Sequence, residues 1–325
     1  MTAQVTLYPS LITFEANGGE SLLAAALRAG LNVDYGCSNG SCGRCLAYLQ
    51  RGKVNAVSHH DFVIAESERA NGGLLMCCQA ASGDIQLTIQ LAHDSSDIPV
   101  QHLTAKVRKL DACDDNTRLL QLRTPRSQTL RFIAGQHARL QLTRELQGEL
   151  PIASCPCDGM NLEFHIHRNS ADRFTDYVFN ELRTGQQIAV EGPSGDFTLI
   201  DDDPSPILFI AWGTGFGPIR SLIEHCLSLE LAQPIALYWV IHEDEVHYAK
   251  GYCRAVADAF DNFNFTALQT DTAAEALQQI QAQAKTLNGW RAYIAAPPAI
   301  IDRCIEQLSE IGLQTSKVKS DPLVA

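Results

Sequence analysis

Residues 35–45 read Tyr-Gly-Cys-Ser-Asn-Gly-Ser-Cys-Gly-Arg-Cys. The three cysteines of this stretch, Cys37, Cys42 and Cys45, follow the spacing C-x4-C-x2-C, and two more cysteines come tens of residues later at Cys77-Cys78. Three ligands in one tight loop and a distant fourth are typical of a plant-type [2Fe–2S] cluster. The spacing therefore predicts a bound cluster and electron transfer.

Three glycines make this loop suitable for a cluster. Gly36, Gly40 and Gly43 let the backbone curl and turn its N–H groups toward the sulfurs, where hydrogen bonds stabilise the added electron. The alternative is a zinc site, but zinc sites usually carry paired C-x2-C arms. A Rieske centre is excluded because no C-x-H accompanies a C-x-x-H.

Length and charge limit the remaining possibilities. A chain of 325 residues suits two or three domains, and a formal net charge of −12 without a basic run argues against nucleic-acid binding. No apolar run reaches the roughly 20 residues that cross a membrane, and the N-terminus lacks the pattern of a signal peptide. We therefore expect a cytoplasmic protein, whose eleven cysteines are not a disulfide framework.

Two polar, proline-bearing seams divide the chain, at residues 94–99 and 201–206. They predict domains at 1–94, 99–202 and 203–325. The first domain mixes short strands with helices near 21–29 and 60–70, which indicates an α+β unit of the β-grasp type. The second domain contains short strands and one helix near 174–182, which indicates an antiparallel β-barrel.

The third domain alternates apolar strands with amphipathic helices, which predicts an α/β, doubly wound parallel sheet whose last strand covers 315–318. Its first strand leads into Gly213-Thr214-Gly215, and Pro218 follows near the start of a helix. A glycine turn before a helix N-terminus suits a pyrophosphate. After the next strand, Glu243 suits the ribose hydroxyls of NADH and would repel a 2′-phosphate, so NADH is favoured.

With its three parts in this order, the chain resembles the reductases that supply electrons to bacterial oxygenases. These belong to the ferredoxin–NAD(P) reductase superfamily with an N-terminal plant-type ferredoxin domain. Further motifs carry the resemblance. They are Gly135-Gln136, the G-P-x-G-x-F segment at 192–197, and Asp172-Arg173-Phe174-Thr175, which resembles the G-x-x-[ST] that holds the flavin diphosphate at a helix start. The resemblance implies FAD in the barrel, NADH as the hydride donor, and an oxygenase or similar redox partner.

The family pattern also suggests site residues. The fourth cluster ligand usually lies seven residues before an Asp that opens the last strand, which favours Cys77 over Cys78 because Asp84 lies seven residues after Cys77. No side chain is expected to act as a catalytic acid or base. The implied flavin-contacting residues are Leu150, Ile152, Ser154, Arg173, Phe174 and Thr175.

The sequence departs from the family at the flavin itself. The motif R-x-Y-S, whose Arg, Tyr and Ser contact the flavin, is replaced by residues 148–151, Gly-Glu-Leu-Pro. The C-G-P-P motif near the nicotinamide reads Ala-Ala-Pro-Pro at 295–298, Trp212 replaces a glycine, and no aromatic residue ends the chain. Losing several such contacts weakens flavin binding.

Two functions therefore stay open. The first is an NADH-dependent iron–sulfur flavoprotein reductase, and the second is a flavin-poor electron carrier or partner-binding subunit whose reductase domains are a scaffold. Among other residues, we expect His165 and His167 on a solvated barrel face, His59-His60 at the start of a helix, and Cys155 and Cys157 as two incidental thiols.

Overall fold

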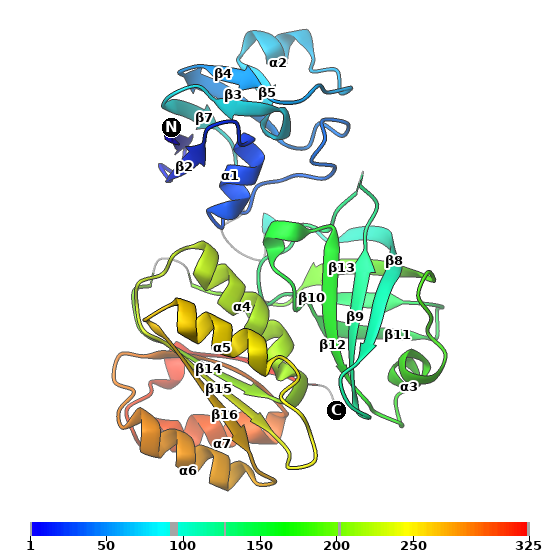
Figure 1. Cartoon of the computed structure of the whole chain (residues 1–325), viewed down its shortest axis with the longest axis vertical. Helices are drawn as coiled ribbons and strands as arrows, with labels where there is room; N and C mark the ends of the chain where they lie inside the picture. The colour runs from blue at the N-terminus through cyan, green and yellow to red at the C-terminus, as the bar shows by residue number, and fades with distance from the viewer. Residues whose placement is uncertain (1, 92–96, 127, 201–202, 324–325) are drawn as a thin grey trace.

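The computed structural model describes residues 2–91, 97–126, 128–200 and 203–323. The chain folds into three parts, with an α+β domain at one end and a β-barrel and an α/β domain side by side below it (Figure 1). This confirms the predicted fold class. The expected boundaries at residues 94 and 202 lie outside the described residues. No helix in the described ranges is long and apolar enough to span a membrane.

The first part is a five-stranded sheet in the order β2-β1-β7-β3-β5, with a small β4-β6 pair beside it. Its apolar core lies between the sheet and helix α1, whose N-cap Ser21 accepts a hydrogen bond from Ala24 N–H. Its elements are β1 (Thr2–Tyr8), β2 (Thr13–Asn17), α1 (Leu22–Arg28), β3 (Leu46–Arg51), β4 (Val54–Ala56), α2 (Glu66–Ala70), β5 (Gly73–Leu75), η1 (Met76–Cys78), β6 (Gln79–Ala81) and β7 (Ile85–Thr88).

The helix predicted to begin at His59-His60 begins only at Glu66, so that prediction is wrong. Residues 60–62 are tied to the cysteine loop instead. A ring nitrogen of His60 lies 2.8 Å from the carbonyl oxygen of Phe62, and Phe62 N–H donates to the carbonyl of Gly40 at 3.0 Å. These contacts hold the segment in a non-helical conformation against the loop.

The second part is a six-stranded antiparallel sheet in the order β11-β10-β13-β8-β9-β12, and β11 approaches β12 as the sheet curls into a barrel (Figure 1). Alternate strand residues fill its core. Its elements are β8 (Gln101–Ala112), β9 (Thr117–Arg123), β10 (His137–Gln141), β11 (Gln147–Pro151), η3 (Pro156–Asp158), β12 (Asn161–His167), α3 (Arg173–Asn180) and β13 (Gln187–Ser194).

The third part is a five-stranded parallel sheet in the order β16-β15-β14-β17-β18, with helices on both faces. The strand expected at 315–318 is a 3-10 turn (η5, Thr315–Lys317), and the strand itself follows it. The elements are β14 (Ile207–Trp212), η4 (Gly213–Gly215), α4 (Phe216–Ser228), β15 (Ile235–Ile241), α5 (Lys250–Ala259), β16 (Phe263–Gln269), α6 (Ala273–Ala284), β17 (Arg291–Ala296), α7 (Pro298–Ser309) and β18 (Val318–Pro322).

The first part is anchored to both of the others. Arg131 of the barrel donates to the side chain of Asn32 at 3.3 Å and to its carbonyl at 3.1 Å. On the other side, a Cβ added to Gly30 would lie 2.8 Å from Cδ2 of Leu229, at the end of α4. The cysteine loop is therefore held at the junction of the three parts.

Candidate electron-transfer site

The cysteine loop requires its glycines. Gly40 and Gly43 have φ angles of +80° and +77°, a region that favours glycine. A Cβ on Gly43 would lie 2.3 Å from a ring carbon of Phe62, and one on Gly40 would lie 2.6 Å from Sγ of Cys78. The sequence therefore forms a tight loop that no larger residue could adopt at these positions.

The sulfurs lie in two pairs. Cys37 N–H donates to Sγ of Cys42 at 3.4 Å, and Cys42 N–H donates to Sγ of Cys37 at 3.3 Å. Sγ of Cys45 lies 3.3 Å from Sγ of Cys77. Two pairs of sulfurs suit a cluster of two irons with two cysteine ligands each.

The two adjacent cysteines have neighbouring sulfurs, 3.5 Å apart, but different further contacts. Sγ of Cys77 lies 3.3 Å from Sγ of Cys45, whereas Cys78 packs against Gly40 and has the carbonyl oxygen of His59 as a distant acceptor at 3.9 Å. This arrangement supports Cys77 as the fourth ligand, as the sequence predicts.

The backbone around Cys37 favours the thiolate that a metal needs. Burial raises the pKa of this thiol, but hydrogen bonds from Ser41, Asn39 and Cys42 outweigh it and lower the pKa to about 6. The Ser41 N–H donates to the Cys37 sulfur at 3.2 Å. The same donors can stabilise a reduced cluster.

Tyr35 connects the cysteine loop with the barrel. Its hydroxyl accepts a hydrogen bond from Gly159 N–H at 2.9 Å and lies 3.4 Å from the carbonyl oxygen of Cys157. Its own carbonyl accepts from the hydroxyl of Thr129 at 3.4 Å. Since Tyr35 lies two residues before Cys37, the ligand loop is held against the barrel loop 155–159.

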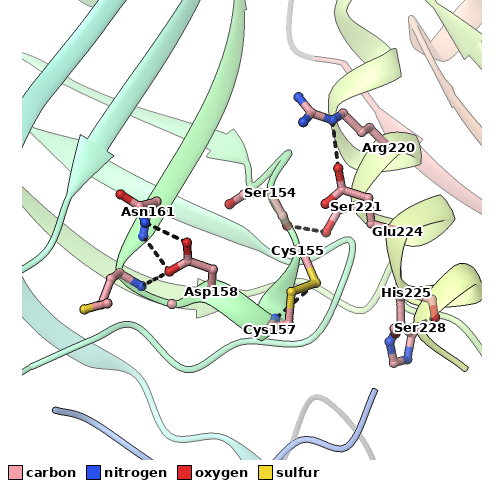
Figure 2. The surroundings of a disulfide bond; sticks show 12 residues. Ser154, Cys155, Cys157, Asp158, Asn161, Arg220, Ser221, Glu224, His225 and Ser228 are labelled. Atoms are coloured by element: carbon pink, nitrogen blue, oxygen red, sulfur yellow. Dashed lines mark hydrogen bonds and ion pairs between the residues drawn. A yellow bond between two sulfur atoms is a disulfide. The ribbon is translucent and has the colours of Figure 1, made fainter. Parts of the chain in front are cut away.

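That barrel loop contains the chain's disulfide. Cys155 and Cys157 are bonded to each other, with Cα atoms 5.2 Å apart (Figure 2). The expectation of two incidental thiols is therefore wrong. Proline at the intervening position starts the turn η3, which brings the two cysteines close together.

Three of the residues predicted to contact the flavin, Leu150, Ile152 and Ser154, lie on the edge strand β11 and on the chain that follows it. We call these three residues the predicted flavin wall. Leu150 lies in β11 and is half-buried against the barrel core, and Ile152 is completely buried. The hydroxyl of Ser154 accepts from Glu163 N–H at 3.2 Å, so it holds strand β12. Glu149 accepts from the hydroxyl of Ser194 at 2.7 Å.

The free N–H groups at the start of helix α3 already bind an anionic side chain, that of Asp172. The carboxylate of Asp172 accepts hydrogen bonds from Phe174 N–H at 3.4 Å and from Thr175 N–H at 2.9 Å. The hydroxyl of Thr175 donates to the carbonyl of Asn169 at 2.7 Å. Arg173 is exposed and lies 3.7 Å from Glu145. The donors that would hold a diphosphate are present, but Asp172 occupies them.

Gly148, at the family's arginine position, has no room for a larger side chain. A Cβ there would lie 2.6 Å from Cδ1 of Phe174, whose ring is buried in the barrel core. Phe174 can therefore offer a ligand only its backbone. The Phe174 ring thus occupies the space that an arginine side chain at position 148 would need.

The glycine turn of the nucleotide end is closely packed. A Cβ on Gly215 would lie 2.3 Å from the carbonyl oxygen of Ala295, whereas Gly213, with φ of +53°, faces open space. Thr214 lies between them in η4, and Pro218 is buried in the first turn of α4. Trp212 is only 5% exposed and packs into the core, so it fills space beside the turn.

Glu243 is exposed after β15, where a ribose-binding acid is expected. Its backbone N–H donates to Asp271 at 3.2 Å, and its carbonyl accepts from Gln269 at 2.7 Å. The loop is thus fixed by its backbone, and the Glu243 carboxylate keeps access to solvent.

A buried polar network joins the barrel to the nucleotide end, and the sequence did not indicate it. His165 is 4% exposed, so the solvated position expected for it is wrong, because α4 and the residues before α5 cover it. His167 is exposed, as the sequence predicts. One ring nitrogen of His165 lies 3.1 Å from Glu163 and the other lies 2.9 Å from the Tyr248 hydroxyl. Arg220 of α4 forms a close ion pair with Glu163.

Comparison with known proteins agrees with this arrangement. The family described as "2Fe-2S iron-sulfur cluster binding domain" matches residues 5–82, and "Oxidoreductase FAD-binding domain" matches residues 104–199. The CDP-6-deoxy-L-threo-D-glycero-4-hexulose-3-dehydrase reductase of Yersinia pestis is 31% identical over 74% of this chain and 71% of its own. The chain belongs to the ferredoxin–NAD(P) reductase superfamily with an N-terminal [2Fe–2S] domain.

Other members of the superfamily cover nearly the whole chain. The reductase component of propane 2-monooxygenase from Gordonia sp. is 27% identical over 94% of this chain and 92% of its own. The crystal structure of an Amycolatopsis cytochrome P450 reductase has the same fold, with a TM-score of 0.63 and 23% identity over 99% of this chain and 98% of its own.

This iron–sulfur flavoprotein reductase is therefore an oxidoreductase that passes electrons from NAD(P)H through FAD to its [2Fe–2S] cluster. FAD supplies the change from a two-electron hydride to single electrons. The cysteine pairs fit the cluster. The N–H donors of Phe174 and Thr175 fit a diphosphate only after the Asp172 side chain turns away.

Proposed function

We propose that this reductase uses NADH and delivers single electrons to an oxygenase or similar redox partner. The observation that carries the proposal is the contact of Tyr35, beside the ligand loop, with the barrel loop that follows the flavin wall. Electron transfer needs the two centres close together, and this contact fixes the cluster domain beside the barrel. Relatives named as reductase components of oxygenase systems support the choice of partner.

Several details belong to the same proposal. Cys37, Cys42, Cys45 and Cys77 bind the cluster, and Glu243 recognises the NADH ribose. The functional domains cover residues 1–94, 99–202 and 203–325, and the protein acts in the cytoplasm. The exposed carboxylate after β15 supports NADH, because it would repel the 2′-phosphate of NADPH.

The alternative, a flavin-poor electron carrier, is favoured by one observation, the occupation of the α3 donors by Asp172. Cofactor analysis of anaerobically purified protein separates the two. Two irons, two sulfides and about one FAD per chain, with NADH bleaching the cluster absorption, support the reductase. A full cluster that NADH cannot reduce even with excess FAD contradicts it.

A further inference from the structure

The Cys155–Cys157 disulfide lies where the three parts of the chain meet. Its loop follows Ser154 directly, at the end of the predicted flavin wall, and Figure 2 shows it beside helix α4. The hydroxyl of Ser221 in α4 donates to the carbonyl of Ser154 at 2.8 Å. On the other side, the Tyr35 hydroxyl lies 3.4 Å from the carbonyl oxygen of Cys157. The disulfide thus lies between the flavin wall and the cluster loop.

Hydrogen bonds hold the loop in addition to the disulfide. The Asp158 carboxylate accepts from Met160 N–H at 3.1 Å and from the side chain of Asn161 at 2.6 Å. The hydroxyl of Thr124 donates to the carbonyl of Gly159 at 3.3 Å. A disulfide between residues two apart removes much less unfolded-chain entropy than one that closes a long loop. As a purely structural bond, this disulfide would therefore add little stability to the fold.

The sulfurs are also accessible. Cys157 is exposed, and Cys155 lines a cleft of about 290 Å³ together with Arg220 and Glu224. None of the nine other cysteines, all of which lie in the described residues, forms a disulfide, so Cys155 and Cys157 are the one disulfide-bonded pair. Accessible disulfides that do not stabilise a fold are the labile kind that take part in redox reactions.

We propose that Cys155 and Cys157 are a redox-active pair that NAD(P)H reduces, an inference that rests on the proposed function. The S–S bond breaks as it takes up two electrons and two protons. NAD(P)H supplies the hydride, which carries both electrons and one proton, and solvent supplies the second proton. The products are NAD(P)+ and two thiols. The pair stores on this chain the two electrons of a hydride, of which the cluster accepts only one.

Alkylation tests the proposal on the full, cluster-replete chain with added FAD. The protein is incubated anaerobically with NADH, quenched with N-ethylmaleimide and digested with trypsin. The peptide of residues 145–168 contains Cys155 and Cys157 and no other cysteine. We expect two alkyl groups on this peptide after NADH and none without it.

Each other outcome has a meaning. A peptide that stays disulfide-bonded while NADH bleaches the cluster overturns the inference but leaves the proposed function intact. Two alkylated thiols without NADH, in protein prepared in air, also overturn it. Alkylation of the peptide without cluster bleaching supports the inference and contradicts only electron delivery to the cluster. If NADH causes neither alkylation nor bleaching, the inference and the proposed function are both overturned.

A double variant, Cys155→Ser with Cys157→Ser, provides a second readout. Sγ of Cys155 accepts the Cys157 N–H at 3.2 Å, and a serine oxygen can accept it too, so the loop should keep its shape. We expect the wild type to consume one more NADH per chain than the double variant under anaerobic conditions, with equal cluster bleaching. Cys113→Ser, at a half-buried free cysteine, is the matched control and should consume as much as wild type. Equal consumption by all three proteins overturns the inference.

Discussion

The carboxylate of Asp172 accepts a 2.9 Å hydrogen bond from the backbone N–H of Thr175. A bound diphosphate would use the same N–H groups, because a helix N-terminus attracts anions through its free donors and its dipole. Carboxylate and diphosphate therefore compete for one place and repel each other. We therefore expect Asp172 to limit how tightly the barrel holds FAD.

Replacing Asp172 with glycine, the residue of the family motif, should tighten FAD binding. We expect the Kd of Asp172→Gly to fall about tenfold, or about 1.4 kcal/mol, because the competing charge is gone. The helix loses little, since a change from Asp to Gly at an N-cap costs only a few tenths of a kcal/mol. Quenching of FAD fluorescence on titration with protein measures the Kd.

The control lies on the same helix. Asp176 is also in the first turn of α3, but its carboxylate accepts a hydrogen bond from the side chain of Asn180 at 2.7 Å. Among the described residues, no backbone N–H donates to this carboxylate. Asp176→Asn should therefore change the Kd much less than Asp172→Gly. If the two substitutions strengthen FAD binding equally, a general change in charge explains the effect and competition at the helix start does not.

The neighbouring cysteines should differ sharply in their importance for the cluster. Cys77→Ser removes the sulfur that lies 3.3 Å from Cys45, so we expect at least a tenfold loss of bound iron and of visible absorption. Cys78→Ser is the matched control and should keep nearly all of its iron, because the Cys78 sulfur contacts Cys77 at 3.5 Å but makes no sulfur contact with Cys45 among the described residues. Iron analysis after reconstitution measures both, and iron loss in Cys78→Ser alone would assign the fourth ligand to Cys78.

The cluster loop was predictable because its chemistry is local. The spacing of Cys37, Cys42 and Cys45 determines which sulfurs one loop can bring together, and the glycines between them permit the required backbone. The strands and helices of the third part were predictable for a similar reason. Their apolar periodicity reports directly which faces are buried, and β14 is buried along its whole length.

The features that the sequence did not reveal depend on contacts between distant segments. Strand β11 reads Gln-Gly-Glu-Leu-Pro and lacks apolar alternation, so only its pairing with β10 makes it a strand. His165 lies in a strand whose outward face looks exposed until α4 covers it. The disulfide likewise depends on a turn that brings two cysteines together, which the residue types alone do not establish.

The buried pair of Glu163 and Arg220 should make stability depend on pH. Burial raises the pKa of Glu163, but the His165 hydrogen bond and Arg220 outweigh it and lower the pKa to about 2. Because the folded pKa is below the ordinary value of 4.5, the stabilisation is complete above pH 4.5 and disappears as pH falls toward 2. Glu163→Gln should therefore cost about 3 kcal/mol of unfolding free energy at pH 6 and much less near pH 3.

Urea denaturation at the two pH values measures this difference. Glu191→Gln is the matched control, since Glu191 pairs with Arg139 at 3.4 Å in an exposed part of the same barrel. Exposed pairs contribute about 0–1 kcal/mol, so this variant should change stability little at either pH. A cost for Glu163→Gln that stays constant between pH 6 and pH 3 contradicts the assignment of the lowered pKa to Glu163.

Glu243 should determine the choice between the two nicotinamide cofactors. If the ribose lies beside it, its exposed carboxylate would accept hydrogen bonds from the hydroxyls of NADH and would repel the 2′-phosphate of NADPH. Glu243→Gln should lower the ratio of kcat/KM for NADH to that for NADPH about tenfold, since a hydrogen bond to a charged group is worth about 1.5–3 kcal/mol. Asp244→Asn, at the next exposed acid, is the matched control and should leave the ratio near its wild-type value. A ratio that falls only in Asp244→Asn would move the recognition to Asp244, and an unchanged ratio in both would place the discrimination outside this loop.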